Sequence, residues 1–99
     1  MSFDSLLIHA LVVRYAASDG TPTTLAEVRG LIQPKAVQEM ALASQAGVEV
    51  GDHTAFLRPL DGLRNDCWFE HAGGRYDIVG IRDAAGRGHH LEIDCRRVG

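Results

Sequence analysis

The feature that most constrains the fold is a series of short segments rich in β-branched, aliphatic and aromatic residues, each ended by turn-forming residues. Such segments favour β-strands, whereas Gly, Pro, Asn and Asp favour turns. The predicted strands span residues 6–15, 23–33, 53–58, 67–71, 76–82 and 89–97. Because most of the connections are short, we predict a mainly all-β fold, a small antiparallel β-barrel of about six strands.

Side-chain alternation predicts which residues face the core. In the last strand, Leu91, Ile93 and Cys95 fall on one face, whereas His90, Glu92, Asp94 and Arg96 fall on the other. This is the pattern of a half-buried strand. By the same rule, Tyr76, Ile78 and Gly80 should share one face, and of the neighbours Trp68 and Phe69 one should face the core and the other should face out.

Pro34 ends the second predicted strand, and a long excursion over residues 34–52 follows it. Residues 35–47 are rich in Ala, Gln, Glu, Met and Leu, which favour a helix, but their apolar positions form only an irregular helical stripe. The excursion exceeds a usual hairpin loop of about 2–5 residues and is expected to be either partly helical or extended. Its apolar side chains either contact another molecule or pack as a short helix that closes one end of the barrel.

Size and composition favour one folded domain over residues 1–99. The chain is 45% hydrophobic and 23% charged, as in ordinary soluble domains. The longest apolar run, Leu6 to Val13, is interrupted by His9 and is shorter than the ~20 residues of a membrane-spanning helix. No basic region precedes this run, so we predict no signal peptide, no membrane association and a cytoplasmic location.

Among enzymatic functions, the sequence points most to a metal site, because several residues that could bind a metal ion occur near one another in the sequence. They are His71, His89, His90, Glu92, Asp94 and Cys95. Adjacent strand residues such as His89 and His90 point to opposite faces, however, and no zinc-type spacing is present. Cys67 and Cys95 lie in alternating strands where a small buried thiol is expected. We therefore predict no catalytic residue, no metal and no cofactor.

A small barrel that binds single-stranded nucleic acid is the second alternative. Trp68, Phe69 and Tyr76 would stack on bases, and Arg75 would contact phosphate. The net charge of −3 and the aromatic content of 6% argue against this function, since dedicated nucleic-acid binders are usually basic.

Four segments together resemble a known family. They are LIQP at 31–34, GDHTAFLRP at 51–59, FEHAGGRYDIVGI at 69–81 and GHHLEIDC at 88–95. In this order, and with a long variable excursion after the first, they are similar to the bacteriophage head-tail joining proteins, also called head-closure, head-completion or stopper proteins. The resemblance covers roughly residues 6–98 and contains no catalytic signature.

The resemblance implies a structural connector in the virion neck, made in the host cytoplasm during assembly of a phage, prophage or gene-transfer particle. Copies of the chain would form a ring, dodecameric in the particle, below the portal or adaptor protein and above the tail proteins. Packaged DNA would pass through the ring without sequence-specific binding. The excursion 34–52 would point into the channel or reach a neighbouring subunit.

On this interpretation we predict a set of subunit or channel contacts and a set of rim charges. The contact residues are Lys35, Val37, Gln38, Met40, Leu42, Gln45, Val48 and Asp52. The rim charges are Arg58, Arg75, Arg87 and Arg96, which would set the register between subunits. The chain is expected to be a monomer or weak oligomer in solution and to form a closed ring on its template, using exposed strand edges and this excursion.

Overall fold

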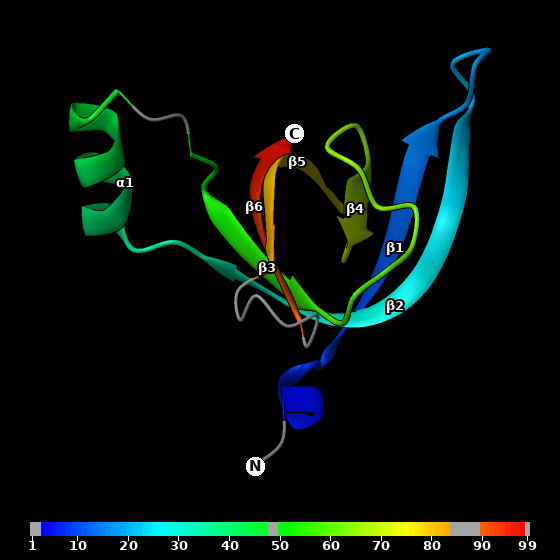
Figure 1. Cartoon of the computed structure of the whole chain (residues 1–99), viewed down its shortest axis with the longest axis horizontal. Helices are drawn as coiled ribbons and strands as arrows, with labels where there is room; N and C mark the ends of the chain where they lie inside the picture. The colour runs from blue at the N-terminus through cyan, green and yellow to red at the C-terminus, as the bar shows by residue number, and fades with distance from the viewer. Residues whose placement is uncertain (1–2, 48–49, 84–89, 99) are drawn as a thin grey trace.

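The computed structural model describes residues 3–47, 50–83 and 90–98. A short 3-10 helix, η1 (Phe3–Leu6), precedes a six-stranded barrel and one α-helix. The strands are β1 (His9–Ala16), β2 (Pro22–Pro34), β3 (His53–Leu57), β4 (Trp68–His71), β5 (Gly74–Asp83) and β6 (Leu91–Val98), and the helix is α1 (Val37–Gln45). The predicted barrel, with a helical excursion between its second and third strands, is confirmed (Figure 1).

The sheet is a closed barrel in the order β1-β2-β3-β6-β5-β4, with antiparallel pairing throughout. Each strand therefore pairs with two neighbours, and β1 closes the barrel against β4 through residues 12–14. Closure removes the free edges of a sheet. The exposed strand edges that we expected as subunit contacts are thus largely paired within the chain, and side-chain surfaces remain for association.

The barrel interior holds one cluster of buried side chains. It contains Leu11, Val13, Ile32, Ala55, Leu57, Cys67, Phe69, Tyr76, Ile78, Ile93 and Cys95. The alternation predicted for the last strand is confirmed, because Ile93 and Cys95 are fully buried and pair opposite Ala55 and His53 of β3. The opposite face of β6 also agrees with the prediction at Arg96, which is exposed.

One prediction of side-chain direction was wrong, and another was right but incomplete. A β-bulge between Ile78 and Gly80 shifts the register of β5, so that Ile81 pairs with the core residue Ile93 and Gly80 falls on the other face. Phe69 belongs to the core cluster and Trp68 faces out, as predicted, yet Trp68 is only 5% exposed. The guanidinium of Arg75 lies 4.0 Å from its ring, and its indole N–H donates to Glu70, so the outward-facing ring is covered.

Candidate functional site

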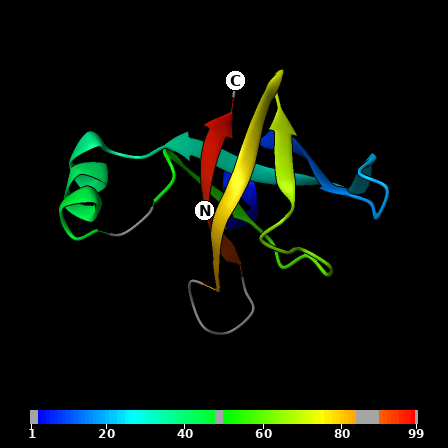
Figure 2. The same ribbon diagram turned by 90° about the horizontal axis from the view of Figure 1, so that it is seen from above.

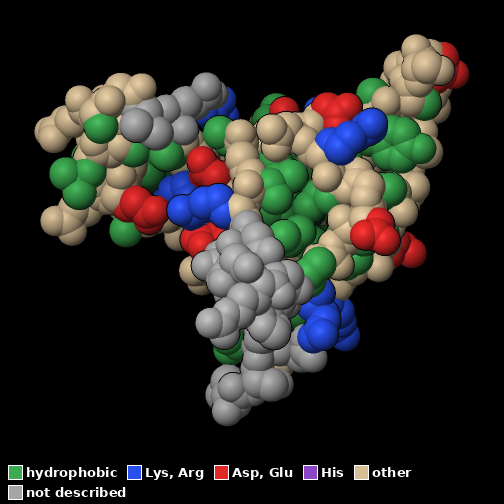
Figure 3. Space-filling view, in the orientation of Figure 1, with side chains coloured by type: hydrophobic (Ala, Val, Ile, Leu, Met, Phe, Trp, Pro, Cys, Tyr) green, Lys and Arg blue, Asp and Glu red, His purple; other side chains and the backbone are tan. Residues whose placement is uncertain are grey.

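The excursion forms an arm, residues 34–52, that leaves the barrel and carries α1 at its outer end. Figures 1 and 2 both place α1 to one side of the barrel. No residue of α1 is buried, and Val37 and Leu42 are 78% and 63% exposed. The alternative that this helix closes one end of the barrel is therefore wrong. Figure 3 shows hydrophobic side chains at the surface of the arm.

Little within the chain stabilises α1. The helix has nine residues, and its N-cap residue, Ala36, provides no side-chain hydrogen bond to its first turn. Helices this short are marginal in water and normally derive their stability from packing of an apolar face. Met40 and Ala43 are only half-buried, whereas Val37 and Leu42 face solvent. The arm thus presents a helix whose apolar side chains are largely uncovered.

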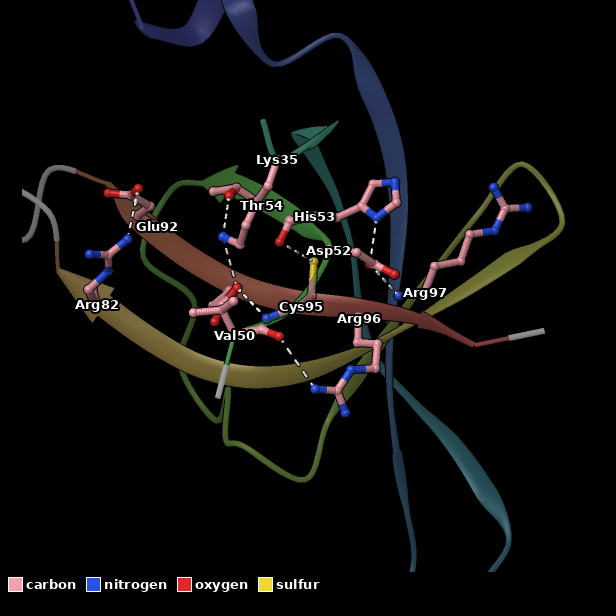
Figure 4. Close-up of polar contacts among 12 residues, drawn as sticks. Lys35, Val50, Asp52, His53, Thr54, Arg82, Glu92, Cys95, Arg96 and Arg97 are labelled. Atoms are coloured by element: carbon pink, nitrogen blue, oxygen red, sulfur yellow. Dashed lines mark hydrogen bonds and ion pairs between the residues drawn. The ribbon is translucent and has the colours of Figure 1, made fainter. Parts of the chain in front are cut away.

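The base of the arm, by contrast, is fixed to the barrel by a buried ion pair (Figure 4). Lys35 Nζ lies 2.8 Å from Asp94 Oδ1 on β6 and donates to Thr54 Oγ1 on β3, also at 2.8 Å. The Lys35 side chain is only 4% exposed and that of Asp94 is 17% exposed. Because the charge of a buried lysine must be compensated, these contacts specify where the first segment of the arm lies.

The returning segment of the arm is fixed to the same carboxylate. The backbone N–H of Gly51 donates to Asp94 Oδ1 at 3.0 Å, and the backbone N–H of Lys35 donates to the carbonyl of Asp52 at 2.9 Å. A side chain at Gly51 would overlap the backbone carbonyl of Cys95, so this close approach to β6 requires glycine. One carboxylate on β6 therefore holds both ends of the arm.

Asp52 adds a second attachment beside the first. Its Oδ1 accepts hydrogen bonds from His53 Nδ1 at 2.7 Å and from the backbone N–H of Arg97 at 2.9 Å. Partial burial would by itself raise the pKa of Asp52, but these two hydrogen bonds and the charge of His53 outweigh it, and the pKa lies below its ordinary value. The His53 ring in turn packs edge-on against Tyr76, with centroids 5.1 Å apart.

The predicted contact residues separate into two groups. Val37, Gln38, Leu42 and Gln45 are exposed on α1, and Met40 is half-buried. Lys35 and Asp52 belong to the base and hold intramolecular contacts, so in this conformation they anchor the arm. Val48 lies outside the described residues. Whether the exposed group contacts another subunit stays a prediction.

The predicted rim arginines do not form one surface. Arg58 is exposed directly after β3, whereas Arg75 pairs with Asp77 at 2.7 Å and covers Trp68. Arg96 donates to the carbonyl of Val50 at 3.4 Å, which adds a contact to the base of the arm. Arg87 lies outside the described residues.

The residues considered for metal binding or catalysis are mostly engaged in other contacts. Asp94 pairs with Lys35, Glu92 pairs with Arg82 at 2.9 Å, and the His71 ring packs against His9. Within residues 3–47, 50–83 and 90–98, no three His, Cys, Asp or Glu side chains form a group that could hold a metal ion. His89 is outside these ranges.

Both cysteines are buried and free, as the alternation predicted. Burial, together with the negative charge of Asp94, raises the pKa of Cys95 to about 12, so its thiol is protonated and a poor nucleophile at neutral pH. Trp68, Phe69 and Tyr76, the rings considered for base stacking, are 5%, 0% and 6% exposed. They provide no open stacking surface in this conformation.

Sequence reasoning missed the base of the arm. Asp94 was assigned to a solvated strand face, and Gly51 and Thr54 were given no role. Gly51 just before a strand was the available signal, since a glycine there often marks a close approach between backbones. The partner of Lys35 lies on the last strand and could not be found from local pattern alone.

Comparison with known proteins adds no assignment: no protein-family model matches the chain, and no curated protein matches it. In the part of the chain that the structure describes, no helix is long and apolar enough to cross a membrane.

Proposed function

We propose that the protein is a structural connector subunit, and not an enzyme, in the neck of a tailed phage, prophage or gene-transfer particle. Copies of the chain form a ring below the portal or adaptor protein, help to retain packaged DNA and dock the tail. The observation that carries this proposal is the arm, in which a helix with no buried residue stands on a base fixed to a closed barrel. Apolar surface of this kind is typical of a site that another molecule covers.

The charge distribution is compatible with a ring around DNA. The chain has a net charge of −3, and Glu39 is the single charged residue of α1. A mildly acidic surface does not attract the phosphate backbone, so DNA can slide past it without being held. This property suits a passage for DNA better than a site that binds it.

Deleting the gene for this protein from the genome of the phage, prophage or gene-transfer particle tests the proposal. Particles that lack the protein should lose packaged DNA and carry few tails, measured as nuclease-protected DNA and by electron microscopy. Wild-type protein should restore both, whereas V37E/L42E should not, because two carboxylates disrupt the apolar helix surface. Thr24→Glu, an exposed change on β2, is the matched control and should restore both. Normal particles after deletion would refute the role.

A further inference from the structure

A groove at the end of the barrel near η1 is the second place where apolar surface is left open. It has a volume of about 860 Å³ and is lined by Leu7, Ile8, Val28, Arg29, Arg58, Pro59 and Leu60. Ile8 is 63% exposed, and Val28 and Leu60 pack against the barrel core. The lining of the groove is therefore mainly apolar, with Arg29 and Arg58 beside it.

The helix and the groove hold three of the large hydrophobic side chains that are exposed. Within the described residues, the large exposed hydrophobic side chains are Leu6, Ile8, Val37, Leu42 and Val98. Val37 and Leu42 belong to α1, and Ile8 lines the groove. Two separate apolar surfaces on one small chain are what a head-to-tail contact between identical subunits requires.

The charges of the two surfaces are complementary. α1 carries Glu39 in its first turn and no basic residue. The described lining of the groove includes Arg29 and Arg58 and no acidic residue. Such an arrangement favours pairing of the helix with the groove and disfavours pairing of two helices or of two grooves.

The helix cannot fill the groove of its own chain. Val28 in the groove and Pro34 at the start of the arm are six residues apart on β2, which corresponds to about 20 Å along an extended strand. The ion pair of Lys35 with Asp94 also fixes the base of the arm. We infer that α1 of one copy docks, through the face shared by Glu39 and Leu42, into the groove beside Arg29 and Arg58 of the next copy.

This inference rests on the proposed ring and names the contact that builds it. A nine-residue helix is about 14 Å long, so each contact is small and weak. The same heterologous contact repeated around a closed ring gains strength from closure. A subunit that is monomeric when dilute and assembles on a template follows from these two properties.

Disulfide trapping between two single-cysteine variants tests the contact in the full-length chain. Leu42→Cys and Ile8→Cys each place a thiol at an exposed position, while native Cys67 and Cys95 are buried and give a low background. Mixed under mild oxidation, the pair should cross-link about tenfold faster than the control pair of Leu42→Cys with Thr24→Cys. Equal rates for the two pairs would overturn the inference. Faster coupling of Leu42→Cys with itself would also overturn it, in favour of a contact between two helices.

Charge reversal gives a second measurement that depends on the same groove. Glu39→Arg in the Leu42→Cys chain should slow the coupling about tenfold, and Arg29→Glu with Arg58→Glu in the Ile8→Cys chain should restore part of it. An unchanged rate would contradict the assigned charge pairing. If trapping fails, this contact is refuted, and the neck role is still tested by the deletion experiment. If particles are normal after deletion, the neck role is refuted even if the copies cross-link.

Discussion

The base of the arm and the helix that it carries are adjacent in sequence but opposite in environment. The side chain of Lys35 is charged and 4% exposed, whereas Val37, two residues later, is apolar and 78% exposed as a residue. In an ordinary domain these burials would be reversed. Buried polar contacts thus fix the direction of the arm, while apolar side chains of its helix stay exposed to solvent. This difference suggests that the base serves the fold and that the helix serves a partner.

The largest expected effect at the base comes from Lys35→Met, which leaves Asp94 near the interior without its cation. We expect a loss of about 3 kcal/mol in the free energy of unfolding, measured by urea denaturation. Lys35→Met with Asp94→Asn should be less destabilised than Lys35→Met alone, because the second change removes the uncompensated charge. Additive losses in this double-mutant cycle would mean that the two groups are not coupled.

Gly51→Ala sharpens the same comparison without changing any charge. The new Cβ would overlap the carbonyl of Cys95, so the returning segment must move away from β6, at a cost of about 1–3 kcal/mol. Gly80→Ala is the matched control, because no atom lies within 4 Å of a Cβ at Gly80. Thermal or urea unfolding of the two variants should differ clearly. Equal stability would show that the base tolerates displacement from β6.

The barrel could be predicted from the sequence because its determinants are local. Alternating side chains and short turns specify strands and antiparallel neighbours, and Ile93 and Cys95 were placed correctly by this rule. The rule failed at Gly80 because a bulge adds one residue to the register. The glycine itself was the available signal, since a glycine inside a strand often marks a bulge. The rule placed one of Trp68 and Phe69 in the core and the other facing out, but it could not show that Arg75, on the neighbouring strand, covers the Trp68 ring.

The candidate site was only half predictable for the same physical reason. Composition indicated a helix in the arm, and its apolar residues were expected to be poorly placed in a monomer. The pairing of Lys35 with Asp94, however, joins residues from opposite ends of the chain and exists only once β2, β3 and β6 are adjacent. The groove near η1 likewise combines segments that are distant in the sequence. Of its two arginines, Arg58 was therefore predicted only as a rim charge, and Arg29 was given no role.

Asp52→Asn tests the outer part of the base through its pH dependence. The pKa of Asp52 is lowered in the folded state, so its carboxylate stabilises the fold above about pH 4. This stabilisation is lost as the pH falls through the folded-state pKa. The side chain is 44% exposed, so we expect a loss of less than about 1 kcal/mol near neutral pH. The variant and the wild type should converge once the pH falls below the folded-state pKa of Asp52. Asp61→Asn, an exposed loop change, is the control, and a pH-independent loss in Asp52→Asn would contradict the electrostatic explanation.

Leu42→Ala should have the smallest effect on folding, and the same substitution at Leu57 provides the contrast. Leu57 is 1% exposed in β3, and its truncation should cost about 2–5 kcal/mol, whereas Leu42 is 63% exposed and its truncation should change stability by no more than about 0.5 kcal/mol. Alanine is also the better helix former. Urea unfolding at low protein concentration isolates the monomer from any contact between copies. If Leu42→Ala proved as costly as a core truncation, α1 would be packed within the chain, and the division between a structural base and a free helix would fail.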